Sequence, residues 1–103
     1  MSTAAKKNNY EELYNAGKRL QVDIGKFLVQ SKKYKVSPKL KNAKSEYEYA
    51  LADFKLVGKY TMDLANKLKT KDINGMSGAY KNFIKYSNSG IKHLNKCSKY
   101  LKA

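Results

Sequence analysis

Apolar residues recur at steps of three and four along three stretches of the chain, a spacing that places them on one side of an α-helix. The first stretch runs from about residue 10 to 34, and the second covers about thirty residues after Ser37-Pro38. The third holds Tyr80, Phe83, Ile84, Ser87, Ile91, Leu94, Cys97 and Leu101 in register. Short connections make consecutive helices antiparallel neighbours. The pattern therefore predicts an all-α fold, an antiparallel up-down-up three-helix bundle.

Polar and small residues predict where these helices begin and end. Asn9 with Glu12 has the spacing of a capping box, and Ser37-Pro38 is a cap followed by proline at the first helical position. The segment 72–78 contains Asn74-Gly75 and Gly78, so it is expected to be a hinge, with Ser77 capping the third helix. Gly58, inside the second helix, predicts either close helix packing or a kink.

The length and composition suit one small domain. At 103 residues and 42% hydrophobic content the chain can bury one modest core. We expect residues 1–8 to be a flexible basic arm and residues 9–103 to form a single three-helix-bundle domain. No uncharged run approaches the ~20 residues of a spanning helix, so membrane insertion is not expected.

The charge is strongly positive. Lys and Arg number 22 against 8 Asp and Glu, a net charge of +14, and Arg19 is the only arginine. Planar, bidentate recognition of phosphate or guanine favours arginine, so a lysine surface gives an electrostatic field with little geometric selectivity. The lysines are either a solvated surface or a functional basic one.

Two lysine clusters have tyrosines nearby. The first cluster, around the first connection, contains no acid, and the second follows one side of the last helix; their members are Lys32, Lys33, Lys35, Lys39, Lys41 and Lys44, then Lys81, Lys85, Lys92, Lys96 and Lys99. Tyrosine beside lysine suits base stacking over a nucleic-acid backbone and equally a protein–protein surface. Tyr10, Tyr47 and Tyr80 lie on the apolar stripes and are expected in the core, whereas Tyr34, Tyr49 and Tyr86 lie off them and are expected to contact a partner.

No combination of residues predicts catalysis or a cofactor. His93 is the only histidine and has Lys92 and Lys96 nearby, so we expect it at the surface. Each acidic residue has a structural role available, at a helix end or beside a lysine one turn away. Cys97 is the only cysteine, which excludes an internal disulfide and a thiolate metal site, and its place on the apolar side predicts a buried thiol. We expect a non-enzyme with no cofactor and no metal.

The stretch Leu68-Lys69-Thr70-Lys71-Asp72-Ile73, with Met76, Ser77 and Ala79, resembles the staphylococcal complement inhibitor family of small secreted three-helix proteins. Tyr49, Phe54-Lys55-Leu56, Gly58 and Met62 are similar to a second region of that family. Two features depart from it: the segment between Met62 and Leu68 is longer, and Leu51 and Ala52 replace a basic pair.

The resemblance implies binding to the third component of complement within the alternative-pathway convertase, which is thereby held inactive. The missing basic pair implies that a weak or inactive family member is an alternative. Family members make contact through the first connection and the N-terminal half of the second helix. Tyr49 and Lys55 match the family there, and Gly58 is a further candidate. Lys39, Lys41 and Lys44 are added because their cluster contains no acid. The expected partner-binding residues are Lys39, Lys41, Lys44, Tyr49 and Lys55.

Other functions and locations stay open. A cytoplasmic basic bundle that binds nucleic acid is one alternative, and a bacteriocin-immunity-like helical protein, suggested by Glu12-Leu13-Tyr14-Asn15, is another. Residues 1–9 have no apolar core of a secretion signal, which by itself predicts a cytoplasmic protein, whereas the family resemblance implies a secreted one whose signal has been removed. We expect a monomer.

Overall fold

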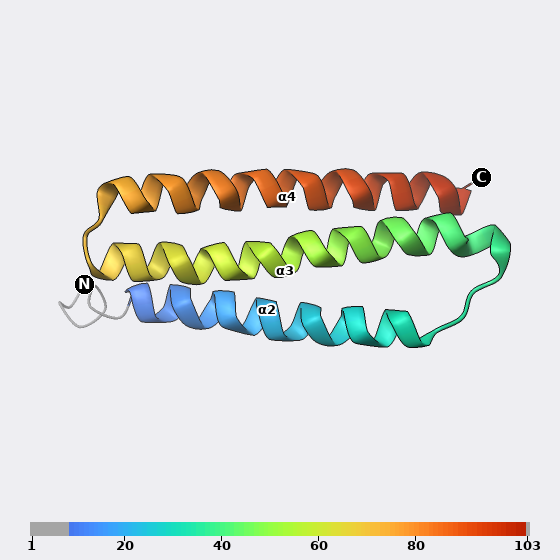
Figure 1. Ribbon diagram of the computed structural model, residues 1–103, viewed down its shortest axis with the longest axis horizontal. Coiled ribbons are helices and arrows are strands. Elements are labelled where there is room, and N and C mark those ends of the chain that lie inside the picture. Colours follow the sequence, from blue (N-terminus) through green and yellow to red (C-terminus); the bar gives the residue numbers. More distant parts are fainter. Residues whose placement is uncertain (1–8, 103) are drawn as a thin grey trace.

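A computed structural model describes residues 9–102, which form three long helices joined by short connections (Figure 1). The elements are α2 (Asn9–Lys33), the short 3₁₀-helix η1 (Pro38–Leu40), α3 (Lys41–Lys69) and α4 (Ile73–Lys102). Within these residues there is no strand. The predicted all-α, up-down-up three-helix bundle is therefore confirmed. The predicted basic arm, residues 1–8, lies outside the described residues.

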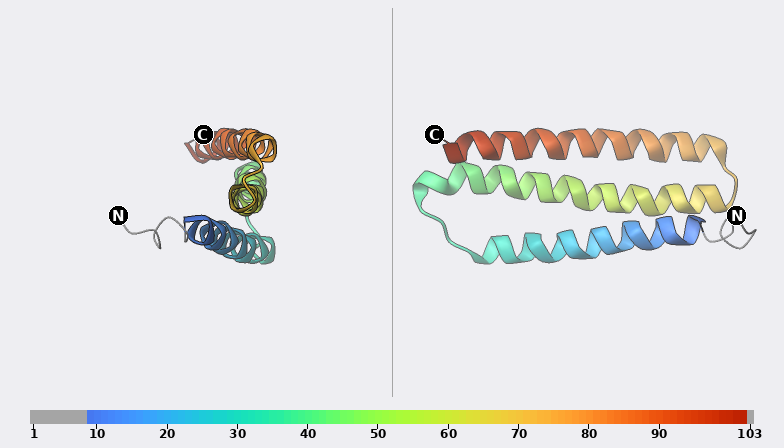
Figure 2. Two further views of the ribbon diagram at one scale, coloured as in Figure 1. Left: turned by 90° about the vertical axis from the view of Figure 1, so that its left-hand side faces the viewer. Right: turned by 180° about the vertical axis from the view of Figure 1, so that it is seen from behind.

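The bundle is open, because α3 lies between the other two helices. Figure 2 shows α2 and α4 on opposite sides of α3, and the two outer helices make almost no contact with each other. The core is correspondingly thin, and none of the large side chains between residues 9 and 102 is fully buried. Its most buried apolar members are mainly small: Ala43, Ala50, Leu51, Val57, Ala65 and Ala79.

Two glycines bring α2 and α3 into backbone contact. A Cβ atom placed on Gly58 would lie 2.7 Å from the carbonyl oxygen of Gly17, and one placed on Gly17 would lie 2.7 Å from the carbonyl oxygen of Gly58. Each helix thus occupies the space where the other would carry a side chain. The close packing expected at Gly58 is confirmed, and its partner is Gly17.

The connection between α3 and α4 is shorter than the sequence predicted. The expected hinge over residues 72–78 and the expected cap at Ser77 are wrong, since α4 begins at Ile73 and contains both residues 74–75 and Gly78. Asp72 caps the helix instead: its Oδ1 accepts a hydrogen bond of 2.9 Å from the backbone N–H of Gly75. A Cβ at Gly75 would lie 2.4 Å from Asp72 Oδ2, so glycine at this position leaves room for the capping side chain. The reversal itself is made by Lys71, whose φ of 56° is left-handed.

The other two helix starts differ from the predictions in detail. Ser37 has extended backbone angles and Pro38 follows at the first position, as expected, but the Ser37 side chain makes no capping hydrogen bond. The proline opens η1, and α3 begins three residues later. Asn9, predicted as a cap, is the first residue of α2. Within residues 9–102, no helix combines the length and the apolar character that crossing a membrane requires.

Candidate protein-interaction surface

One end of the bundle brings all three helices together around the first connection. We call it the hinge end, and it is the end opposite to residues 72–78. It comprises the last turns of α2, residues 34–40, the first turns of α3 and the last turns of α4, all at the right of Figure 1. A groove of about 380 Å³ opens here. Its lining is largely apolar and comprises Phe27, Gln30, Ser31, Tyr34, Val36, Leu40, Ala43, Lys44, Tyr47, Cys97 and Leu101.

The groove lies where a non-helical segment separates the end of α2 from η1 and the start of α3. Residues 34–37 are non-helical and carry Tyr34 outward, so that 70% of this side chain is exposed. The Lys44 ammonium donates a hydrogen bond to the backbone carbonyl of Tyr34 and fastens the connection to α3. Phe27 and Leu101, also solvent-exposed, project from α2 and α4 into the same groove. Large apolar side chains are therefore displayed at this end and held in place by helices.

Three of the five predicted partner-binding residues lie at the hinge end. Lys39 is exposed on η1, Lys41 is exposed at the start of α3, and Lys44 is half-buried one turn later. Lys41 and Lys44 also border a second groove together with Lys32 and Lys35. The structure thus brings the lysines of the first connection together, as the sequence suggested.

The expectation that this cluster is free of acid is wrong. Glu48 lies in the second groove, and its Oε1 atom is 3.8 Å from Lys32 Nζ. The other carboxylate oxygen, Oε2, is buried and accepts no hydrogen bond from residues 9–102. The sequence alone did not reveal this contact, because Glu48 follows Lys32 by sixteen positions and the two meet only through the antiparallel packing of α2 and α3.

The remaining two predicted contact residues do not join that cluster. Tyr49 and Lys55 are six residues apart on α3, which turns them by about 240° around the helix axis. Tyr49 lies on the side of α4, where its ring centroid is 5.3 Å from that of His93. Lys55 lies on the side of α2, beside Gly25. The five predicted residues therefore form one lysine cluster and two separate positions.

The tyrosines divide differently from the prediction. Tyr80, expected in the core, is 54% exposed, and Tyr47 is also solvent-exposed, so the prediction for these two is wrong. For Tyr80 the open bundle is the reason, because α4 has no second helix to cover that part of its apolar stripe. Tyr34 and Tyr49 are exposed as expected. Tyr86, expected at a contact surface, is half-buried and stacks on Tyr60 at a centroid distance of 5.6 Å.

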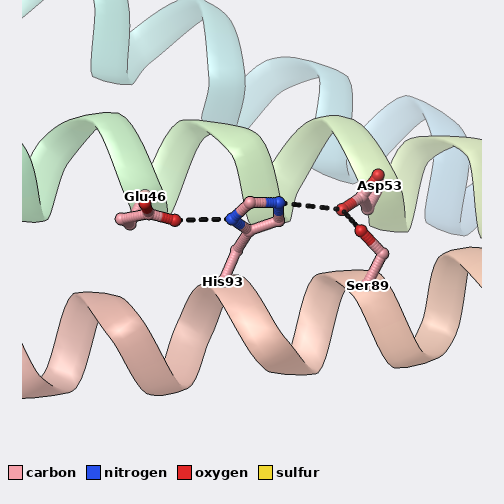
Figure 3. A network of polar contacts seen from close by, with 4 residues as sticks. All are labelled: Glu46, Asp53, Ser89 and His93. Atoms are coloured by element: carbon pink, nitrogen blue, oxygen red, sulfur yellow. Dashed lines mark hydrogen bonds and ion pairs between the residues drawn. The ribbon is translucent and has the colours of Figure 1, made fainter.

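A polar network that the sequence did not predict joins the first half of α3 to the second half of α4 (Figure 3). His93 Nδ1 lies 2.5 Å from Glu46 Oε2, and His93 Nε2 lies 3.9 Å from Asp53 Oδ2. Ser89 donates a hydrogen bond of 2.7 Å to the same Asp53 oxygen. His93 is half-buried, so the prediction that it lies at the surface is wrong. The spacing held a signal: Glu46 and Asp53 are seven residues apart on one helix, while Ser89 and His93 are four apart on the other.

This network is suited to holding helices together. A serine nucleophile needs its hydroxyl group on the imidazole that removes its proton. Here the Ser89 hydroxyl donates to Asp53 instead, and the imidazole nitrogen nearest to a partner faces Glu46. The arrangement crosslinks α3 to α4 without forming a nucleophile–base pair.

Two further groups of side chains were considered in the sequence, metal ligands and the single thiol. Across residues 9–102, no group of three or more His, Cys, Asp or Glu side chains could hold a metal ion. Cys97 is half-buried and lines the apolar groove at the hinge end, so it lies on the apolar side as predicted but is not a buried thiol. Its position follows from the open face of α4. The groove and the lysines beside it are left as the candidate site.

Comparisons with known protein families, with curated proteins and with solved structures find no match to this chain.

Proposed function

We propose that this protein is a non-catalytic binding module that recognises a partner protein through its hinge end. The observation that carries the proposal is the apolar groove with exposed Tyr34, Phe27 and Leu101 at its edges, next to Lys39 and Lys41. Large aromatic and aliphatic side chains that become buried on binding supply most of the energy at protein–protein contacts. The lysines beside them steer an acidic partner toward the groove.

Several observations favour a protein partner over nucleic acid at this site. The groove is lined mainly by apolar side chains, whereas a nucleic-acid surface follows phosphates with cations. The lysine cluster also includes Glu48, which offsets part of its charge. Arginine, the side chain best suited to phosphate and guanine, occurs once, as Arg19 on α2.

The resemblance to the complement inhibitors suggests which partner to test first. The partner we propose is the third component of complement, bound within the alternative-pathway convertase, and such a role requires secretion. The residues of the longest shared stretch, 68–79, lie at the other end of the molecule, where Lys71 and Asp72 make the turn into α4. The resemblance in this stretch is therefore accounted for by a turn of the same kind and not by a contact with the partner. The contact surface corresponds to the hinge end, which family members use.

The test is binding of the purified full chain to immobilised third component and to its activated form, measured by surface plasmon resonance. Tyr34→Ala should weaken binding about tenfold or more, as expected for a central aromatic contact. Tyr14→Ala is the matched control, because Tyr14 is also exposed but borders a groove with Asn66 and Lys69 at the opposite end. It should leave the affinity within about twofold. Absence of binding to either form would remove the complement assignment.

A parallel measurement separates a protein partner from nucleic acid. Binding of a labelled single-stranded oligonucleotide is followed between about 50 and 200 mM salt, where release of counterions makes nucleic-acid affinity fall steeply. We expect no specific oligonucleotide binding near physiological salt. Tight, steeply salt-dependent binding that Lys39→Glu with Lys41→Glu abolishes would replace the protein-binding proposal with a nucleic-acid one.

A further inference from the structure

A second apolar surface runs along α4, outside the site described above. Its members are spaced alternately by four and three residues: Tyr80, Ile84, Ser87, Ile91, Leu94, Ser98 and Leu101. We call this set the α4 seam. Its five large members are all solvent-exposed, by 38% to 61%: Tyr80, Ile84, Ile91, Leu94 and Leu101. Only Leu101 is shared with the groove at the hinge end.

The α4 seam is distinct from the face that α4 packs against α3. That packing face contains Ala79, Tyr86 and Gly90: Ala79 is buried, Tyr86 stacks on Tyr60, and Gly90 adjoins the ring of Phe54. The seam residues follow these by one position, a rotation of about 100° around the helix. Since α2 lies beyond α3 and almost does not touch α4, no helix within residues 9–102 covers the seam (Figure 2).

The spacing of the seam indicates what kind of partner covers it. A strict alternation of four and three residues keeps apolar side chains facing one helix that winds around another, as in a coiled coil. The α4 seam keeps this alternation from Tyr80 to Leu101, with serine in place of an apolar residue at two of its seven positions, over a length of about 32 Å at 1.5 Å per residue. Three heptads of this length fit a single amphipathic helix laid along α4.

The charges beside the seam select the sequence of that helix. α4 contains no Asp or Glu in its 30 residues. The positions next to the seam on its outer flank carry only lysine and asparagine, namely Lys81, Lys85, Asn88, Lys92, Asn95, Lys99 and Lys102. Charges at such flanking positions set partner choice in helix pairs. A second copy of this chain would bring the same lysines, whereas carboxylates would pair with them.

We propose that the α4 seam is a docking site for an amphipathic helix of a partner protein that has an apolar heptad face and acidic flanks. This inference goes beyond the proposed function, because it concerns the length of α4 and a helical ligand. It does not depend on complement binding at the hinge end.

A synthetic helical peptide tests the proposal directly. The peptide has three heptads, with leucine at the two apolar positions and glutamate at the flanking ones. A control peptide has lysine in place of every glutamate. Binding of each labelled peptide to the full chain is measured by fluorescence anisotropy, at peptide concentrations where it is monomeric. We expect saturable binding of the glutamate peptide and none of the lysine peptide.

Two matched variants locate the binding on the chain. Ile91 is 51% exposed in the middle of the seam, and Val29 is 57% exposed on α2, away from it. Ile91→Ser should weaken the glutamate peptide about tenfold, because the exposed half of an isoleucine side chain loses its burial. Val29→Ser should change the affinity less than twofold. Circular dichroism checks that both variants keep the helical content of the parent chain.

Several outcomes would overturn the proposal. Equal binding of the two peptides would remove the acidic partner, and an unchanged affinity for Ile91→Ser would remove the seam as the site. If the parent chain sediments as a dimer and Ile91→Ser as a monomer, the seam belongs to a second copy. Binding to anionic phospholipid vesicles that Ile91→Ser abolishes, without peptide binding, would assign it to a membrane surface.

Discussion

Replacing Gly58 with alanine tests the closest contact in the bundle. The added Cβ would lie 2.7 Å from the carbonyl oxygen of Gly17, 2.8 Å from the backbone N of Gln21 and 3.1 Å from its Cα atom. All three neighbours are backbone atoms of α2, so no side chain can turn away to make room. The helices themselves must separate along this crossing.

Two opposing effects determine the magnitude. Alanine in a helix interior is favoured over glycine by about 1 kcal/mol. Overpacking a tight contact costs about 1–3 kcal/mol, and a contact between two backbones belongs at the upper end of that range. We therefore expect Gly58→Ala to reduce the free energy of unfolding by about 2 kcal/mol, which lowers the melting temperature by about 8–16 °C in a domain of this size.

The assay is thermal and urea unfolding followed by circular dichroism at the helical band. Gly78→Ala is the control, because nothing lies within 4 Å of a Cβ atom at Gly78, and this residue is also inside a helix. With propensity acting alone, Gly78→Ala should stabilise the protein by up to about 1 kcal/mol. The same substitution is thus expected to have opposite signs at two positions.

A Gly58→Ala protein that is as stable as the parent, or more stable, would refute the reasoning. It would mean that α2 and α3 do not approach each other as described, so that propensity alone governs both positions. A large change in the slope of the urea transition would point instead to a difference in the unfolded ensemble.

Further predictions concern the second turn and the polar network. Asp72→Ala removes the cap of α4 and should cost about 1 kcal/mol in urea unfolding, while Asp72→Asn, which keeps an acceptor oxygen, should cost much less. Lys71→Gly should stabilise the protein by about 0.5–1 kcal/mol, because glycine takes the left-handed backbone conformation without a penalty, and a loss of stability would contradict the turn. His93→Ala should cost about 1–3 kcal/mol, since Glu46 loses its partner at the half-buried α3–α4 interface. If the double variant, Glu46→Gln with His93→Ala, loses as much stability as the two single variants added together, the two residues are not coupled.

The sequence predicted the helices well and their ends less well. Repeating apolar steps of three and four identified all three helices, because this spacing follows from local geometry. Gly75 and Gly78 were interpreted as breakers, yet both lie inside α4. Their signal was overridden because Asp72 forms the cap, and Gly75 accommodates the cap carboxylate.

The candidate site was predicted only in part. The lysines of the first connection are neighbours in sequence, so their grouping at the hinge end could be anticipated. The His93 network and the contact of Glu48 with Lys32 join different helices, and their register is fixed only by packing. The complement partner, secretion and the monomeric state stay predictions.

The sequence by itself determined three amphipathic helices, a lysine-rich surface and an α4 without any acid, since these follow from residue order and composition. The tertiary structure alone decided which parts of the apolar stripes are buried. Periodicity gives each helix an apolar side but not the number of neighbours that cover it. With α3 between α2 and α4, one side of α4 meets α3 and the next remains exposed, which is why Tyr80 and Ile91, though on an apolar stripe, lie at the surface.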